Sequence, residues 1–250
     1  ASIEDLATLM IELGAADSNV VQALRGHVGF VEFVLAHPDA AFRARWLRRI
    51  AEGALVGNAE SEAAGTFADI RTELRVDGAR QALHGVKYYT TGSLFADWMV
   101  VSAARTDPVS GKRRLVSVPV PTTAPGVRID DDWDGFGQRL TASGTATFDD
   151  VEVDPADVHQ HSVAAYTDTV LNAVFQLVHL AALAGIARAA LDEITDFVRS
   201  RPRNVFNPGY AFRNDPVALQ ITGETFGAVE TVRSAVLAAA RTVDHTSTLQ

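Results

Sequence analysis

Two short polar clusters of this chain contain residue types that suit the binding of a flat heterocycle. The first is Gly57-Asn58-Ala59-Glu60-Ser61-Glu62, and the second is Lys87-Tyr88-Tyr89-Thr90-Thr91-Gly92-Ser93. Aromatic rings can pack against a planar ring, and amide and hydroxyl groups can hydrogen-bond to its polar edge. A strand over the second cluster would place Tyr89 and Thr91 on one face and the residue before each on the other. The alternative is a strand of β-forming residues whose hydroxyl groups face water.

Histidines are the other side chains that could do chemistry. His27 follows Leu24-Arg25-Gly26 on an expected helix, where a lone histidine is structural, exposed or functional. His159 and His161 form a His-x-His pair in an expected loop, but no third ligand of matching spacing accompanies them, so we expect no metal site. His179 lies on an apolar helix and is expected to be a core histidine. The chain has no cysteine, which excludes disulfide bonds and thiolate metal sites.

The composition limits the partners that we expect. A formal charge of −9 argues against nucleic-acid binding, which needs a basic surface to displace counterions. The most apolar window, 170–190, contains four polar residues, so we expect a bundle helix and no membrane span. A chain without cysteine or an Asn-x-Ser/Thr site fits a cytoplasmic protein. Four arginines between 43 and 49 are expected to form the solvated face of a helix; they are Arg43, Arg45, Arg48 and Arg49.

The elements that must position these residues follow the order helices, strands, long helices. Ser2 with Asp5 predicts a capped helix to Leu13, and two further helices are expected to end near Gly53. Strands are expected near 54–60, 70–77, 81–91, 97–104, 113–120 and 144–153. A 3.6-residue period predicts a long helix from about Tyr166 and a last helix from Asp215-Pro216. This segregation indicates an α+β fold with a small sandwich or barrel.

The order of elements and four motifs resemble the acyl-CoA dehydrogenase superfamily of flavoproteins over essentially the whole chain. The motifs are Gly-x-x-x-Gly-Asn-Ala-x-Ser-Glu (53–62), Gly-x-Lys-Tyr-Tyr-Thr-Thr-Gly (85–92), Trp-Asp-Gly-Phe-Gly-Gln-Arg-Leu-Thr-Ala-Ser-Gly (133–144) and Phe-Asp-Asp-Val-Glu-Val (148–153). The resemblance implies an N-terminal helical domain (1–52), a central β-barrel domain that contacts flavin (53–160) and a C-terminal helical bundle (161–250). It also implies that the first and last of these domains are incomplete in this sequence.

Within the superfamily, the variants are similar to those of the flavin-dependent monooxygenases that act on dibenzothiophene and alkyl sulfones. Dehydrogenases have Thr-Glu-Pro where this chain has 58–62, and Trp-Ile-Thr-Asn where it has Tyr89-Thr90-Thr91-Gly92. Some dehydrogenases place a catalytic glutamate where this chain has 175–179, a stretch without a carboxylate.

This resemblance implies a two-component monooxygenase. Reduced FMN from a separate flavin reductase would react with O2 to a C4a-hydroperoxyflavin, which would oxidise a small, apolar, sulfur-containing substrate. The absence of a Gly-rich dinucleotide motif agrees with electrons that arrive from a partner. A homotetramer is also implied, and neither nucleic acid nor a membrane is expected as a partner.

The resemblance implies roles for individual residues as well. Catalytic roles fall on His27, Asn58 and Thr91, with Thr90 in place of Thr91 if the strand register slips by one residue. Flavin contacts fall on Asn58, Ser61, Tyr89, Thr91 and Ser93. An arginine-rich stretch that reaches the flavin phosphate corresponds to Arg199, Arg201 and Arg203.

Two other functions stay open at this point. One is an FAD-dependent acyl-CoA dehydrogenase, because the later helices that carry its other common base lie beyond this sequence. The second is a non-catalytic or incomplete flavin-fold protein.

Overall fold

The computed structural model describes residues 2–63, 69–107, 110–160, 170–202, 205, 208–209 and 211–247. The chain forms two compact units, and each is considered by itself. The sheet unit comprises Gln22–Phe175, and the helical unit comprises Ala1–Val21 with Gln176–Gln250. The mixed α+β class expected from the sequence is confirmed.

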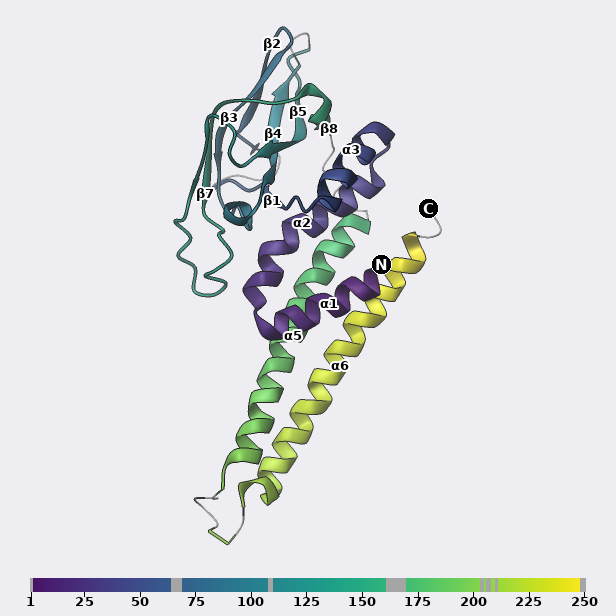
Figure 1. Ribbon diagram of the computed structural model, residues 1–250, viewed down its shortest axis with the longest axis vertical. Helices are drawn as coiled ribbons and strands as arrows, with labels where there is room; N and C mark the ends of the chain where they lie inside the picture. Colours follow the sequence, from purple (N-terminus) through teal and green to yellow (C-terminus); the bar gives the residue numbers. More distant parts are fainter. Residues whose placement is uncertain are drawn as a thin grey trace. The chain divides into compact units, whose positions relative to one another are not determined.

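The sheet unit contains most of α2 (Ser18–Ala36), all of α3 (Ala40–Ala51), and one sheet of eight strands (Figure 1). The strands are β1 (Val56–Ala59), β2 (Glu73–Asp77), β3 (Arg80–Lys87), β4 (Trp98–Thr106), β5 (Arg113–Pro121), β6 (Val127–Asp130), β7 (Thr145–Glu152) and β8 (His159–Gln160). Their order is β6-β7-β3-β2-β4-β5-β8, with β1 pairing in parallel to β4. Alternating buried residues of these strands form one core, which includes Leu83, Val101, Val118 and Phe148. Strands β6 and β8 were missed by the sequence analysis because they are short.

The strand expected to run to Thr91 ends at Lys87, so the expected alternation of Tyr89 and Thr91 is wrong. Tyr88 forms only an isolated bridge to Ser61, and Tyr89 has a left-handed backbone with φ of 59°. Gly92 also has positive φ, and a Cβ there would lie 2.3 Å from the carbonyl oxygen of Ala23. The chain therefore leaves the sheet in a tight turn that accepts only glycine at its closest approach to α2.

A buried ion pair joins Glu62, at the end of the first polar cluster, to Lys87, at the start of the second. The side chain of Lys87 is fully buried, and its Nζ lies 2.9 Å from Oε1 of Glu62. Glu62 also accepts hydrogen bonds from the backbone N–H groups of Arg71 and Thr72. Burial opposes the charged form of Glu62, but these hydrogen bonds outweigh it and lower its pKa to about 2.

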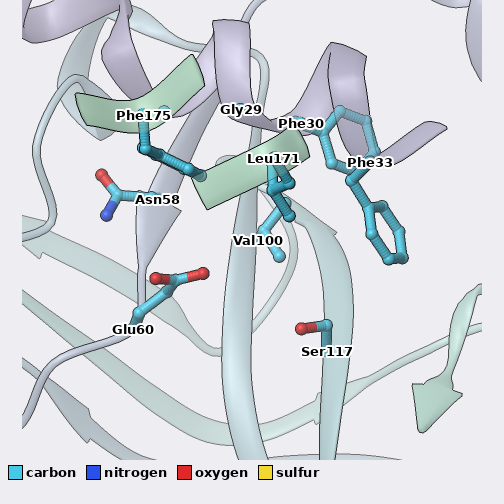
Figure 2. Close-up of a pocket in the computed structure, with 10 residues that line it drawn as sticks. Gly29, Phe30, Phe33, Asn58, Glu60, Val100, Ser117, Leu171 and Phe175 are labelled. Carbon is cyan, nitrogen blue, oxygen red and sulfur yellow. The ribbon is translucent and has the colours of Figure 1, made fainter. Parts of the chain in front are cut away.

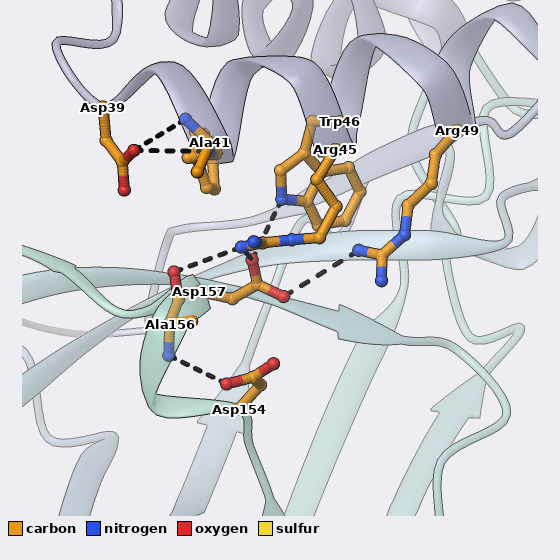
Figure 3. A network of polar contacts seen from close by, with 9 residues as sticks. Asp39, Ala41, Arg45, Trp46, Arg49, Asp154, Ala156 and Asp157 are labelled. Carbon is orange, nitrogen blue, oxygen red and sulfur yellow. Dashed lines mark hydrogen bonds and ion pairs between the residues drawn. The ribbon is translucent and has the colours of Figure 1, made fainter.

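The arginines of α3 are not simply a solvated face, which corrects the expectation for Arg45 and Arg49. Asp157 forms ion pairs with both of them and accepts a hydrogen bond from Trp46 Nε1 at 3.1 Å (Figure 3). The guanidinium of Arg49 also stacks on the rings of Trp46 and Trp98. These contacts attach α3 to the sheet, whereas Arg48 is exposed.

The helical unit consists of α1 (Ile3–Ala16), most of α5 (Val170–Ser200) and α6 (Pro216–Ser247) (Figure 1). The predicted capping box of Ser2 and Asp5 is confirmed at the start of α1. Asp244 of α6 also accepts hydrogen bonds from the N–H groups of Ile3 and Glu4.

Small residues let α1 and α5 approach closely. A Cβ at Gly185 would lie 2.6 Å from backbone atoms of Gly14 and Ile11. By length and composition alone, α5 meets the criteria for a membrane-crossing helix, a test that core helices of soluble proteins also pass. The predicted start of this helix at Tyr166 lies outside the described residues.

Candidate functional site

The structure brings three of the predicted polar residues together where β1 meets the turn that follows β3. The backbone N–H of Asn58 on β1 points to the carbonyl oxygen of Thr91 at 3.4 Å, and Ser93 Oγ lies 3.4 Å from the carbonyl oxygen of Asn58. A Cβ at Gly57 would lie 2.6 Å from Ser93 Oγ, so this glycine permits the close approach of the turn to β1. The Asn58 amide and the Thr91 hydroxyl are neutral groups that could hold the polar edge of a heterocycle, whereas Ser93 is fully buried and its hydroxyl supports β1.

A hydrogen-bonded row of hydroxyl groups continues inward from this turn. Thr91 Oγ1 lies 2.8 Å from Ser143 Oγ, which lies 2.7 Å from Thr141 Oγ1. Thr141 Oγ1 donates to the carbonyl oxygen of Gln138 at 2.8 Å. Thr90, by contrast, is fully buried and its hydroxyl donates to the carbonyl oxygen of Gly144. Of the two threonines, Thr91 is therefore the one that retains exposed surface, 8% of its total.

His27 lies on α2 beside the start of β1. Its Nδ1 accepts a hydrogen bond from the backbone N–H of Val56 at 3.3 Å. Burial lowers the pKa of His27, because it disfavours the charged imidazolium. The neutral ring with its hydrogen on Nε2 matches this hydrogen bond, so His27 could donate a hydrogen bond from Nε2 to a ligand.

An apolar cavity of about 30 Å³ lies between α2, the sheet and the start of α5 (Figure 2). Its lining includes the glycines Gly26 and Gly29, the apolar residues Phe30, Phe33, Val100, Leu171 and Phe175, and the polar residues Asn58, Glu60 and Ser117. The Phe175 ring fills the space that a side chain at Gly29 would need. A cavity of this size holds one or two water molecules, so a substrate needs an aromatic side chain to move.

Two opposite charges border this cavity. Glu60 follows β1, and both it and Asn58 line the cavity (Figure 2). The guanidinium of Arg25 lies 4.7 Å from the centroid of Phe175, and its Nε donates to the Phe175 carbonyl oxygen. Burial lowers the pKa of Arg25, while the charge of Glu60 opposes this shift. The otherwise apolar cavity thus has one acidic and one basic neighbour.

The remaining predicted flavin contacts are more dispersed. Ser61 is exposed and meets Tyr88 through its backbone, at 2.9 Å. The Tyr89 ring is 55% exposed and packs edge-on against Trp133. Arg199 and Arg201 belong to the helical unit, where Arg201 stacks on Phe197 and Phe212. Their phosphate contact stays a prediction, and Arg203 lies outside the described residues.

The other histidines do not assemble a metal site in the described part of the chain, where no group of three or more suitable ligands occurs. His159 lies on β8, not in a loop, and packs against His37 and Phe42 with ring centroids 4.4 Å and 4.0 Å away. His161 lies outside the described residues. His179 is half-buried on α5, so it lies at the margin of the core expected for it.

Sequence reasoning missed the aromatic lining of the cavity and the hydroxyl groups beyond Thr91. Phe30, Phe33 and Phe175 read equally well as ordinary core residues of helices, and nothing in their spacing marks a cavity. Thr141 and Ser143 did lie in a motif that had been singled out, 133–144, but their proximity to Thr91 depends on strand pairing.

Comparison with known proteins identifies the family. Residues 56–151 match the acyl-CoA dehydrogenase middle domain. The FMN-bound crystal structure of TdsC from Paenibacillus sp. A11-2 superposes with a TM-score of 0.89 at 26% identity, covering 98% of this chain and 64% of that one. This chain belongs to the acyl-CoA dehydrogenase superfamily. Within it, the resemblance to the branch of flavin-dependent monooxygenases is also confirmed.

Two curated relatives are also similar to this chain. Dibenzothiophene monooxygenase from Mycolicibacterium goodii is 29% identical over 190 residues, which is 72% of this chain and 46% of the relative. L-evernosamine nitrososynthase from Micromonospora sp. is 33% identical over 208 residues, which is 79% of this chain and 48% of the relative. The chain thus spans about half the length of the curated relatives it matches.

Proposed function

We propose that this chain is the flavin-binding and substrate-binding part of an FMN-dependent monooxygenase. Reduced FMN comes from a separate reductase, O2 is the second substrate, and a small apolar molecule is oxidised. The observation that carries the proposal is that Asn58, which lines the apolar cavity, meets Thr91 and Ser93. The kinship with dibenzothiophene monooxygenase and with FMN-bound TdsC supports it.

The residues fit the cofactor. Flavin carries a polar edge of ring nitrogens and carbonyl oxygens, and neutral amide and hydroxyl groups can pair with either kind of atom. Asn58 would hold this edge, Thr91 would face N5, and Tyr89 and Ser61 would complete the wall. Ser93, whose hydroxyl is buried against the Asn58 backbone, would position Asn58. Arg199 and Arg201 would bind the flavin phosphate in a homotetramer, because the guanidinium fork matches phosphate oxygens.

Bound reduced flavin supplies the electrons that activate O2, and the protein supplies orientation and a dry site. The Phe30 and Phe175 side chains line the cavity next to Asn58 and leave little room for water there. His27, neutral and with its hydrogen on Nε2, would donate a hydrogen bond toward the oxygen that is transferred. No step needs a charged acid, which agrees with the neutral donors that line this edge.

The substrate class follows from the cavity. Its apolar lining and the dibenzothiophene-oxidising relatives favour a small sulfur-containing molecule. A second candidate is the N-oxidation of an amine. The Glu60 carboxylate at the cavity and the 33% identity to L-evernosamine nitrososynthase favour this alternative.

The test is anaerobic titration of the full-length protein with reduced FMN, followed by mixing with ¹⁸O₂ and one substrate. Dibenzothiophene and an amino sugar nucleotide are compared, and mass spectrometry measures ¹⁸O in each product. Asn58→Ala is expected to weaken FMN binding about tenfold, because it removes hydrogen bonds to the polar edge. Asn19→Ala, which removes an amide from the start of α2 in the helical unit, is the matched control and should leave FMN binding unchanged.

Each alternative has its own outcome. Tight binding of FAD with anaerobic bleaching by an acyl-CoA would instead indicate a dehydrogenase. Failure of the full-length protein to bind either flavin would indicate a non-catalytic member of the fold.

A further inference from the structure

We propose that Thr91, Ser143 and Thr141 form a reversible hydroxyl relay that sets whether Thr91 accepts or donates a hydrogen bond at the flavin. The inference rests on the proposed flavin site and adds Ser143 and Thr141 to it as positioning residues. The relay is short and continuous, with oxygen–oxygen distances of 2.8 Å and 2.7 Å. Its inner end is the carbonyl oxygen of Gln138, 2.8 Å from Thr141 Oγ1.

The relay is shielded from solvent along its length. Thr141 is fully buried, while Ser143 and Thr91 keep 7% and 8% of their surface exposed. Water therefore has little access to compete for these hydrogen bonds. Their direction is set by the few protein groups at each end and by whatever binds at Thr91.

The backbone holds the relay in place. The turn that carries Thr91 is joined to the segment of Ser143 by hydrogen bonds from Thr90 N to Gly144 O (3.1 Å) and from Gly92 N to Thr141 O (2.9 Å). Among the described residues, four other than glycine have positive φ, and three of them lie beside the relay; they are Tyr89, Gln138 and Ala142. Ala142, with φ of 50°, separates the two inner hydroxyl residues in sequence. Such left-handed residues are costly and cluster at functional sites.

Two directions of the relay satisfy the protein. In the inward direction, Thr91 donates to Ser143, Ser143 to Thr141, and Thr141 to the Gln138 carbonyl oxygen. In the outward direction, Thr141 donates to Ser143 and Ser143 to Thr91, which frees the Thr91 hydrogen. The Gln138 carbonyl oxygen then keeps its hydrogen bond from Trp133 Nε1 at 2.8 Å. Each hydroxyl only rotates, so every hydrogen stays on its own oxygen.

The two directions match the two redox states of a flavin. N5 carries a hydrogen in reduced flavin and therefore donates, whereas N5 of oxidised flavin is an acceptor. Without a bound flavin, the inward direction has one more short hydrogen bond than the outward direction. In the outward direction the Thr91 hydroxyl can donate only to the Tyr89 carbonyl oxygen, which is 3.4 Å away. The resting relay thus presents a Thr91 lone pair, which favours the reduced cofactor.

The experiment compares the dissociation constants of oxidised and reduced FMN for the full-length protein and its variants. Ser143→Ala should reduce the preference for reduced FMN by roughly twofold to tenfold, because Thr91 loses the partner that orients it. The ¹⁵N signal of N5-labelled FMN should shift in the same variant. Ser143→Thr keeps the hydroxyl, so its preference for reduced FMN and its N5 signal should equal those of the wild-type protein. Thr141→Val should also reduce the preference, since it removes the inner end of the relay.

Thr122→Val is the matched control. It removes a threonine hydroxyl that also donates to a backbone carbonyl, that of Ala96 at 2.7 Å, but lies outside the relay. Its redox preference should equal that of the wild-type protein. If Ser143→Ala and Thr141→Val bind FMN with the wild-type preference and the wild-type N5 signal, the relay is refuted while the flavin site stands. If the wild-type protein binds neither form of FMN, the proposed function fails together with the relay.

Discussion

The sheet unit and the helical unit are stabilised in different ways. The sheet unit buries polar groups in pairs and rows, including Lys87 with Glu62, Asp157 with Trp46, and the hydroxyl relay. In the helical unit, α1 and α5 meet through backbone contact at small residues such as Gly185. Buried polar pairs specify where each group points, whereas small residues specify only how close two helices come. The residues proposed for the flavin ring accordingly lie in the unit whose buried groups have fixed partners.

The largest expected effect breaks the buried pair of the sheet unit. Lys87→Met leaves the Glu62 carboxylate buried without its cation, and it should lower the free energy of unfolding by about 3–5 kcal/mol. Chemical denaturation measures this loss. The double variant Lys87→Met/Glu62→Gln removes the unpaired charge and should recover a substantial part of the stability. A single variant as stable as the wild-type protein would show that the pair contributes nothing.

A smaller effect is expected from filling the helical contact. The Cβ of Gly185→Ala would lie 2.6 Å from backbone atoms of α1, so the helices must separate. Overpacking of this kind costs about 1–3 kcal/mol, and faster hydrogen exchange of the α1 amides should accompany it. Gly223→Ala is the matched control in α6, because nothing lies within 4 Å of its Cβ. That control should be neutral or slightly stabilising, since alanine favours a helix.

The smallest effect concerns pH and again belongs to the sheet unit. Burial, with the nearby charge of His37, lowers the pKa of His159 from 6.5 to about 4. Between these values the unfolded chain binds a proton that the folded chain does not, so stability falls as the pH decreases from about 6.5 toward 4. The loss attributable to His159 should be about 1–2 kcal/mol between pH 7 and pH 4.5.

His159→Phe should make that pH dependence shallower, because phenylalanine does not titrate and suits a site beside Phe42 and Phe33. Urea denaturation at several pH values measures the slope. Identical slopes for the variant and the wild-type protein would contradict the assignment.

Much of the fold could be predicted because its signals are local. The capping box of Ser2 and Asp5, the N-cap at Asp215 and the 3.6-residue periods are each contained in a few consecutive residues, and the helices were found with nearly correct ends. The strands β6 and β8 were missed because runs of four and two residues are too short to show an alternating pattern.

The site could be predicted only in part. Asn58, Thr91 and Ser93 were named from two motifs, and the structure places them in contact. The end of the strand at Lys87 could not be predicted, because the left-handed conformation of Tyr89 has no signal in its residue type. The ion pairs of Asp157 with Arg45 and Arg49 could not be predicted either, because more than a hundred residues separate the partners.

The sequence by itself determined the order of elements, the family resemblance and the polar motif residues, because each depends on residues that are close together in the sequence. Only the tertiary structure decided that Thr91, and not Thr90, keeps exposed surface, and that its hydroxyl meets Ser143. The physical reason is that a turn with positive φ values reorients side chains independently of alternation along a strand. The relay of Thr91, Ser143 and Thr141 exists because two segments fifty residues apart dock through backbone hydrogen bonds.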